Sequence, residues 1–264
     1  GINYGLPLIP HALASWAANA IDRIVQERYL SLEELGFYSF GYKIGQIMSN
    51  LVDSINLAWM PVYYRWMTSE AHPEKKIGTV FELYMFIVGY INLGLILFIG
   101  ELFSLILPAE YLASLQYIGP VLIGYFLMGV YKFSSAPFFY YKKTKYVPFL
   151  TIGAAIFNYT MNVLFVPRYG AIASSWITLL TYGMVAMTAV FVGRKFQKLP
   201  LEKGGIFTIL LFLILSNIIV LNLIAWSFEA LLIKTLLMIG FGLLRFKTLR
   251  KALFILSSGG FHEE

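Results

Sequence analysis

Long apolar stretches alternate with short polar segments along the whole chain. A helix that crosses the hydrocarbon core of a bilayer needs about 20 predominantly apolar residues. Eight stretches are candidates, at residues 5–26, 36–64, 78–100, 117–139, 147–166, 170–193, 206–226 and 229–244. Their apolar residues are continuous and do not alternate with polar ones, which favours helices over a transmembrane barrel. The pattern predicts an all-α, polytopic helical membrane protein.

The composition supports this class and disfavours a soluble enzyme. Of 264 residues, 59% are hydrophobic and 13% are charged, whereas a soluble domain has about 25% charged residues. The chain has no cysteine, which excludes a disulfide scaffold. It also lacks a phosphate-binding glycine loop, a nucleophile elbow and the zinc motif HExxH. We therefore expect a protein that is not an enzyme, with no catalytic residue, metal or cofactor.

Basic residues predict the orientation of the eight spans. The loops that follow the second, fourth and sixth spans, together with the C-terminal tail, contain Arg65, Lys75, Lys76, Lys142, Lys143, Lys145, Arg194, Lys195, Lys198, Lys203, Arg245, Lys247, Arg250 and Lys251. The alternate loops contain only Arg28 and Arg168. Since cytoplasmic loops of membrane proteins are enriched in Lys and Arg, both ends of the chain are expected in the cytoplasm. This asymmetry explains the net charge of +6 without a nucleic-acid partner.

Polar residues form one stripe on each of the first two spans. A charged side chain at the centre of a bilayer costs about 2.5–3.5 kcal/mol on insertion scales, so such residues indicate function. In the first span the stripe has helical spacing and consists of Asn19, Asp22, Arg23 and Gln26. In the second span the stripe lies within an arc of about 80° and consists of Lys43, Gln46, Asn50 and Asp53. We expect both stripes to face a shared polar cavity.

Four of the charged residues have a second interpretation. Lys43 lies close enough to the outer surface to extend its ammonium group there. Lys132, in the fourth span, belongs either to the cavity or to the inner surface. Asp22 and Arg23 either face the cavity or form an ion pair at a helix interface.

The remaining polar residues within the spans have structural interpretations. Lys234 is expected to extend to the outer surface, and Glu82 and Glu101 are expected to be solvated near span ends. Asn158 and Asn162 are expected to form hydrogen bonds between helices.

Two short motifs predict local structure around the second span. Ser31 and Glu34 have the spacing of a capping box, which places the start of the helix there. Gly41 and Gly45 form a GxxxG pair, which indicates close packing against another helix.

Two segments of the sequence resemble a known family. The first contains Gly5-Leu-Pro-Leu-Ile-Pro-His11, Trp16, Asn19, the Asp22-Arg23 pair and the run from Leu35 to Ser39. The second is NYTMNVLFVPRYGAIASSW at residues 158–176. Both resemble the C-terminal half of bacterial polysaccharide export proteins. The most similar group is the O-antigen, or lipid-linked oligosaccharide, flippases, in the superfamily that includes the multidrug and toxic-compound extrusion antiporters.

The resemblance implies an architecture of two six-helix lobes around a central cavity. Residues 1–193 would be the second lobe, and residues 194–256 would form two additional helices and a basic tail. Residues 257–264 would be a polar, disordered end, and the first lobe would precede Gly1. The implied location is the bacterial inner membrane.

The resemblance also implies a substrate, an oligosaccharide repeat unit on undecaprenyl pyrophosphate that is flipped to the outer leaflet by alternating access. Basic residues of the cavity would hold the pyrophosphate, namely Arg23, Lys43 and Lys132. Amides would contact the sugars, namely Asn19, Gln46 and Asn50. Asp22 and Asp53 would compensate positive charge or carry a coupling proton or sodium ion. The expected partners are this substrate and membrane lipids.

Two alternative functions remain. A multidrug or organic-cation antiporter needs an acidic cavity, whereas the two stripes and Lys132 do not give an excess of acids. The second alternative is a membrane-embedded glycan polymerase. Such enzymes usually have a large outer loop, whereas the predicted outer loops here are short.

Overall fold

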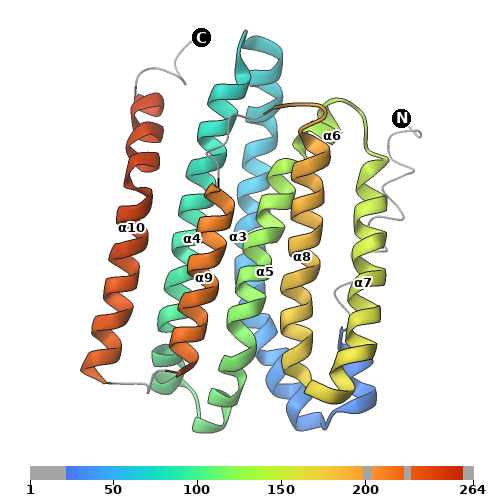
Figure 1. Cartoon of the computed structure of the whole chain (residues 1–264), viewed down its shortest axis with the longest axis vertical. Helices are drawn as coiled ribbons and strands as arrows, with labels where there is room; N and C mark the ends of the chain where they lie inside the picture. The colour runs from blue at the N-terminus through green and yellow to red at the C-terminus, as the bar shows by residue number, and fades with distance from the viewer. Residues whose placement is uncertain (1–21, 199–203, 223–226, 258–264) are drawn as a thin grey trace. The chain divides into compact units, whose positions relative to one another are not determined.

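The computed structural model describes residues 22–198, 204–222 and 227–257, and the regular elements of this part are helices (Figure 1). After a helical segment at residues 22–29, the elements are α3 (Leu32–Ser69), α4 (Pro73–Ile106), the 3-10 helix η1 (Ala109–Ser114), α5 (Leu115–Ser134), α6 (Ala136–Tyr140), α7 (Tyr146–Tyr169), α8 (Ala171–Gly193), α9 (Gly205–Asn222) and α10 (Phe228–Ser257). The predicted all-α class is confirmed.

The helices follow the predicted spans closely. Each of the seven stretches from 36–64 to 229–244 coincides with a long helix, and the first stretch lies outside the described residues except for its last few positions. The stretch at 117–139 is interrupted after Ser134, because Pro137 in the first turn of α6 has no amide hydrogen to continue the ladder. By length and composition, five helical segments of the described part can cross a membrane: α4, the segment Ala109–Tyr140, α7, α8 and α9. The chain is a multi-pass membrane protein.

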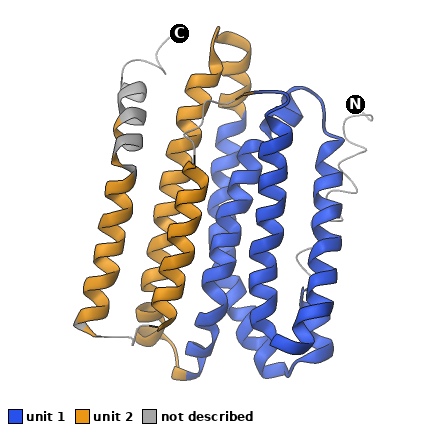
Figure 2. Ribbon diagram, in the orientation of Figure 1, with its two compact units in different colours: residues 1–60, 110–197 blue, residues 61–109, 198–264 orange. Residues whose placement is uncertain are grey.

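The chain divides into two compact units (Figure 2). Unit 1 contains residues 1–60 and 110–197, and within it α8 packs against both α5 and α7. Unit 2 contains residues 61–109 and 198–264, and within it α4 packs against α9 and α10. This division reflects which helices pack against each other. The predicted lobe boundary at residue 193 concerns the architecture of a transporter and stays a prediction, as does a disordered end after Ser257.

The GxxxG pair brings α3 and α5 into close contact within unit 1. A Cβ atom at Gly41 would lie 2.9 Å from the carbonyl oxygen of Ser114, and one at Gly45 would lie 2.4 Å from Cγ1 of Val121. No side chain fits at either position without a shift of the neighbouring helix. Close helix packing at these glycines is confirmed.

A hydrogen-bond network joins α7 to α8, as predicted for the two asparagines. The amide of Asn158 donates to Oγ1 of Thr181 at 3.3 Å, and the hydroxyl of Ser174 donates to Oδ1 of Asn162 at 2.6 Å. The amide of Asn162 also donates to Oδ1 of Asn158 at 3.0 Å. These buried bonds fix the register of the two helices that form one wall of the site described below.

The expectation for the charged residues of unit 2 was wrong. The ammonium group of Lys234, on α10, forms an ion pair with the carboxylate of Glu101, on α4, and only 4% of the Lys234 side chain is exposed. Glu82, also on α4, is buried. Because α10 packs along α4, the opposite charges neutralise each other in place of extending to water.

Candidate functional site

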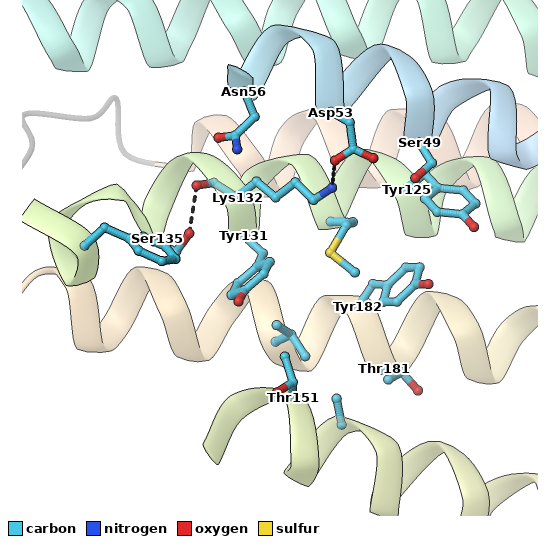
Figure 3. A pocket seen from close by; sticks show the side chains of 14 residues that line it. Ser49, Asp53, Asn56, Tyr125, Tyr131, Lys132, Ser135, Thr151, Thr181 and Tyr182 are labelled. Atoms are coloured by element: carbon cyan, nitrogen blue, oxygen red, sulfur yellow. Dashed lines mark hydrogen bonds and ion pairs between the residues drawn. The ribbon is translucent and has the colours of Figure 1, made fainter. Parts of the chain in front are cut away.

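A polar cavity of about 360 Å³ lies within unit 1 between α3, α5, α7 and α8 (Figure 3). Its polar lining consists of Ser49, Asp53, Asn56, Tyr125, Tyr131, Lys132, Ser135, Thr151, Thr181 and Tyr182. Four apolar residues complete it, namely Met128, Phe139, Ala154 and Val185. A cavity of this size can hold several water molecules or a small polar group.

The cavity contains an ion pair between helices that are distant in the sequence. The ammonium group of Lys132, on α5, meets the carboxylate of Asp53, on α3 (Figure 3). The exposed fractions of the two side chains are 23% and 50%, so neither charge is fully enclosed by protein. Lys132 lines the cavity, and its role there stays a prediction.

Asn56 adds an unsatisfied polar atom to the same cavity. Its Oδ1 is buried and has no hydrogen-bond partner among the described residues. A buried acceptor without a partner costs about 1–3 kcal/mol, so this oxygen is a candidate contact for water or a ligand. The sequence analysis did not select Asn56, although its position one helical turn after Asp53 places it on nearly the same face of α3.

A row of tyrosine rings extends from the cavity to the start of α3. The ring centroids are 5.6 Å apart for Tyr182 and Tyr125, 6.1 Å for Tyr125 and Tyr42, and 5.8 Å for Tyr42 and Tyr38. At the far end, the hydroxyl of Tyr38 donates a hydrogen bond to the carboxylate of Asp22. We call Tyr182, Tyr125, Tyr42 and Tyr38 the tyrosine row. It is the main feature of the site that the sequence analysis missed, and the spacing of Tyr38 and Tyr42 was its available signal.

Asp22 and Arg23 each contact a tyrosine of α3. Asp22 is buried against Tyr38, and the guanidinium carbon of Arg23 lies 4.9 Å from the ring centroid of Tyr42. A cation at this distance from an aromatic ring is attracted to its face. The tyrosine row therefore connects the polar stripe of the first span to the cavity that contains Lys132.

The other predicted site residues lie elsewhere. Lys43 is exposed and lines a separate pocket near the start of α3. Gln46 is half-buried and Asn50 is exposed, and neither lines the cavity. The ten residues between Lys43 and Asp53 correspond to about 15 Å along a helix, so residues on one face reach different depths. Asn19 lies outside the described residues.

Helices that cross a membrane and enclose a cavity lined by charged and polar side chains are typical of membrane transporters. The part of the chain that the structure describes contains no group of His, Cys, Asp and Glu that could hold a metal ion.

Comparison with known proteins gives one family match over part of the chain and one similar fold. The family model for polysaccharide biosynthesis proteins matches residues 2–116. The crystal structure of the MATE transporter VcmN from Vibrio cholerae, in the bent form, is similar with a TM-score of 0.58 and 17% sequence identity. The match covers 83% of this chain and 52% of that structure, so the chain spans about half the length of VcmN. No curated protein matches significantly. The family match covers less than half of the chain, and the structural similarity shows a fold shared with that transporter structure.

Proposed function

We propose that this chain takes part in flipping an undecaprenyl-pyrophosphate-linked oligosaccharide from the cytoplasmic to the outer leaflet of the bacterial inner membrane. Such a step supplies O-antigen for lipopolysaccharide. The family match to polysaccharide biosynthesis proteins supports a polysaccharide substrate, and the fold supports transport. The observation that carries the proposal is the Lys132–Asp53 ion pair in a cavity between the helices of unit 1.

The physical problem is the transfer of a charged, hydroxyl-rich head group through hydrocarbon. Each polar group that loses water without a replacement hydrogen bond costs several kcal/mol. The cavity offers replacements, since it is lined by hydroxyls, the amide of Asn56 and the tyrosine rings of Tyr125, Tyr131 and Tyr182. In this proposal the head group crosses inside the protein by alternating access while the polyprenyl chain stays in lipid.

Lys132 is the proposed contact for pyrophosphate. An ammonium group binds phosphate as a mobile point charge. In the unliganded cavity Asp53 neutralises Lys132, and a phosphate of higher charge displaces the carboxylate. Arg23 is proposed as a second phosphate contact, beside Tyr42 in the half of the tyrosine row that does not line the cavity. The amides of Asn19, Gln46 and Asn50 remain proposed sugar contacts.

The membrane potential favours outward movement of the head group. One elementary charge moved through 100 mV is worth about 2.3 kcal/mol, so two negative charges gain about 4.6 kcal/mol. A proton or sodium ion bound at Asp22 or Asp53 is a second proposed source of energy.

The proposed orientation places both chain ends in the cytoplasm. The cavity is lined by Ser135 and Phe139, which lie a few residues before the basic segment at 142–145. Basic loops face the cytoplasm, so this orientation places the cavity towards the leaflet in which the substrate is made.

Substitutions at the chromosomal locus test the role of Lys132. We expect Lys132→Ala to abolish surface glycan and to leave lipid-linked repeat units of unchanged length on the inner face. Lys132→Arg retains the charge and should retain part of the activity. The double variant Lys132→Met with Asp53→Asn removes both charges, so it should insert normally and stay inactive.

Two results would refute the role of Lys132. One is normal surface glycan in Lys132→Ala at normal protein levels. The other is restored activity in the uncharged double variant, since that would mean that the ion pair serves only structure. If Lys132→Ala lowered drug resistance and left surface glycan unchanged, the result would indicate the antiporter alternative.

A further inference from the structure

A second pocket of unit 1, of about 470 Å³, lies where the start of α3 meets η1. Its lining consists of Glu33, Gly36, Phe37, Ser39, Phe40, Lys43, Glu110 and Tyr111. We propose that this pocket is a carbohydrate subsite, which binds one sugar residue of the oligosaccharide outside the Lys132 cavity. The inference rests on the proposed function, because that function supplies a sugar-bearing substrate.

Three aromatic side chains form one wall of the pocket. The ring of Tyr111 lies 4.9 Å from that of Phe40 at an interplanar angle of 61°, and 6.3 Å from that of Phe37 at 87°. Edge-on contacts of this kind hold the rings at fixed angles to one another. All three side chains are only half-buried, so part of each ring is accessible. Such a surface suits the apolar C–H face of a sugar ring.

The polar side chains of the pocket suit sugar hydroxyls better than a phosphate. Glu33, Glu110 and Lys43 are exposed there, so two carboxylates accompany one ammonium group. Carboxylates accept strong, charge-assisted hydrogen bonds from hydroxyls, and the ammonium group donates them. The excess of negative charge repels pyrophosphate. Lys43 is thereby assigned to sugar binding, whereas the resemblance implied phosphate binding.

Gly36 gives access to the pocket without a role in packing. A Cβ atom built there meets nothing within 4 Å, whereas Gly41 and Gly45 on the same helix have close neighbours. A larger side chain at position 36 would therefore project into open space that belongs to the pocket. This property allows the pocket to be filled while the helix packing stays intact.

Saturation-transfer NMR on the purified protein in lipid nanodiscs tests the subsite. The probes are two lipid-free trisaccharides, maltotriose and tri-N-acetylchitotriose. We expect saturation transfer from the wild-type protein to at least one of them. The signal should fall at least five-fold in Gly36→Trp and in Tyr111→Ala. It should be unchanged in Gly153→Trp, a matched control because a Cβ at Gly153 on α7 also meets nothing within 4 Å.

Other results overturn the subsite without deciding the proposed function. One is the absence of saturation transfer to both trisaccharides in the wild-type protein. Another is a signal that persists in Gly36→Trp and disappears in Lys132→Ala, which would place sugar binding in the Lys132 cavity. Failure of the proposed function is a separate result, namely normal surface glycan in Lys132→Ala. That measurement does not depend on the binding of free trisaccharides.

Discussion

The carboxylate of Glu34 accepts a hydrogen bond of 2.8 Å from the backbone amide of Ala171, 137 residues further along the chain. The first amides of a helix have no partner within it, and a negative charge near them is favourable. Glu34 thus satisfies the start of α8. In the predicted capping box only the Ser31 half forms, where Oγ of Ser31 accepts from the amide of Glu34 at 3.2 Å. The bond between Glu34 and Ala171 joins the two segments on which the family resemblance was based.

Glu34→Ala is expected to lower the free energy of unfolding by about 1 kcal/mol, the usual effect of losing a helix cap. Gly170→Ala should have an effect at least as large. Gly170 has a φ of +68°, and a Cβ there would lie 2.6 Å from Oε1 of Glu34. Unfolding in detergent, followed by circular dichroism, measures both. Gly153→Ala is the control, and equal stability of all three variants would contradict the cap.

Tyr38→Phe removes the hydroxyl that donates to the buried carboxylate of Asp22. Loss of one partner from a buried hydrogen bond costs about 1–3 kcal/mol. We expect lower stability in the same unfolding measurement. Tyr29→Phe is the control because Tyr29 is exposed. Equal stabilities for Tyr38→Phe and Tyr29→Phe would show that the hydroxyl contributes nothing.

Lys234→Ala should leave Glu101 charged and without its partner in unit 2. Breaking a buried ion pair by removal of one member costs about 3–5 kcal/mol. The double variant Lys234→Met with Glu101→Gln should recover most of this loss. The pair of Lys76 and Glu70 is a control, because it is more exposed and its loss should cost less than about 1 kcal/mol. A Lys234→Ala variant as stable as Lys76→Ala would refute the buried pair.

Gly45→Ala should destabilise the contact between α3 and α5 by about 1–3 kcal/mol, as expected for an overpacked interface. Val121→Ala in the same chain should restore part of the stability, since Cγ1 of Val121 is the atom that the new Cβ would meet. Gly36→Ala meets no neighbour and should not destabilise the protein. Absence of rescue by Val121→Ala would argue against this contact.

Much of the fold could be predicted because lipid leaves the backbone little choice. A segment in hydrocarbon must satisfy its own amides and carbonyls, so apolar stretches of sufficient length become helices. The close approach at Gly41 and Gly45 and the hydrogen bonds of Asn158 and Asn162 followed from residue types that have few other roles within a span. The end of α5 at Ser134 was harder to predict from the sequence, because a proline near a helix end either bends or terminates the helix.

For the residues that the structure describes, the sequence by itself determined the helices and their approximate ends, since these depend on neighbours within a few turns. Only the tertiary structure decided which charges meet. Lys132 pairs with Asp53, and Lys234 pairs with Glu101, while Lys43 lies in a different pocket. The reason is that helical periodicity fixes the direction of a side chain but not which helix lies opposite it. The depth and partner of each charge come from packing between segments far apart in the chain.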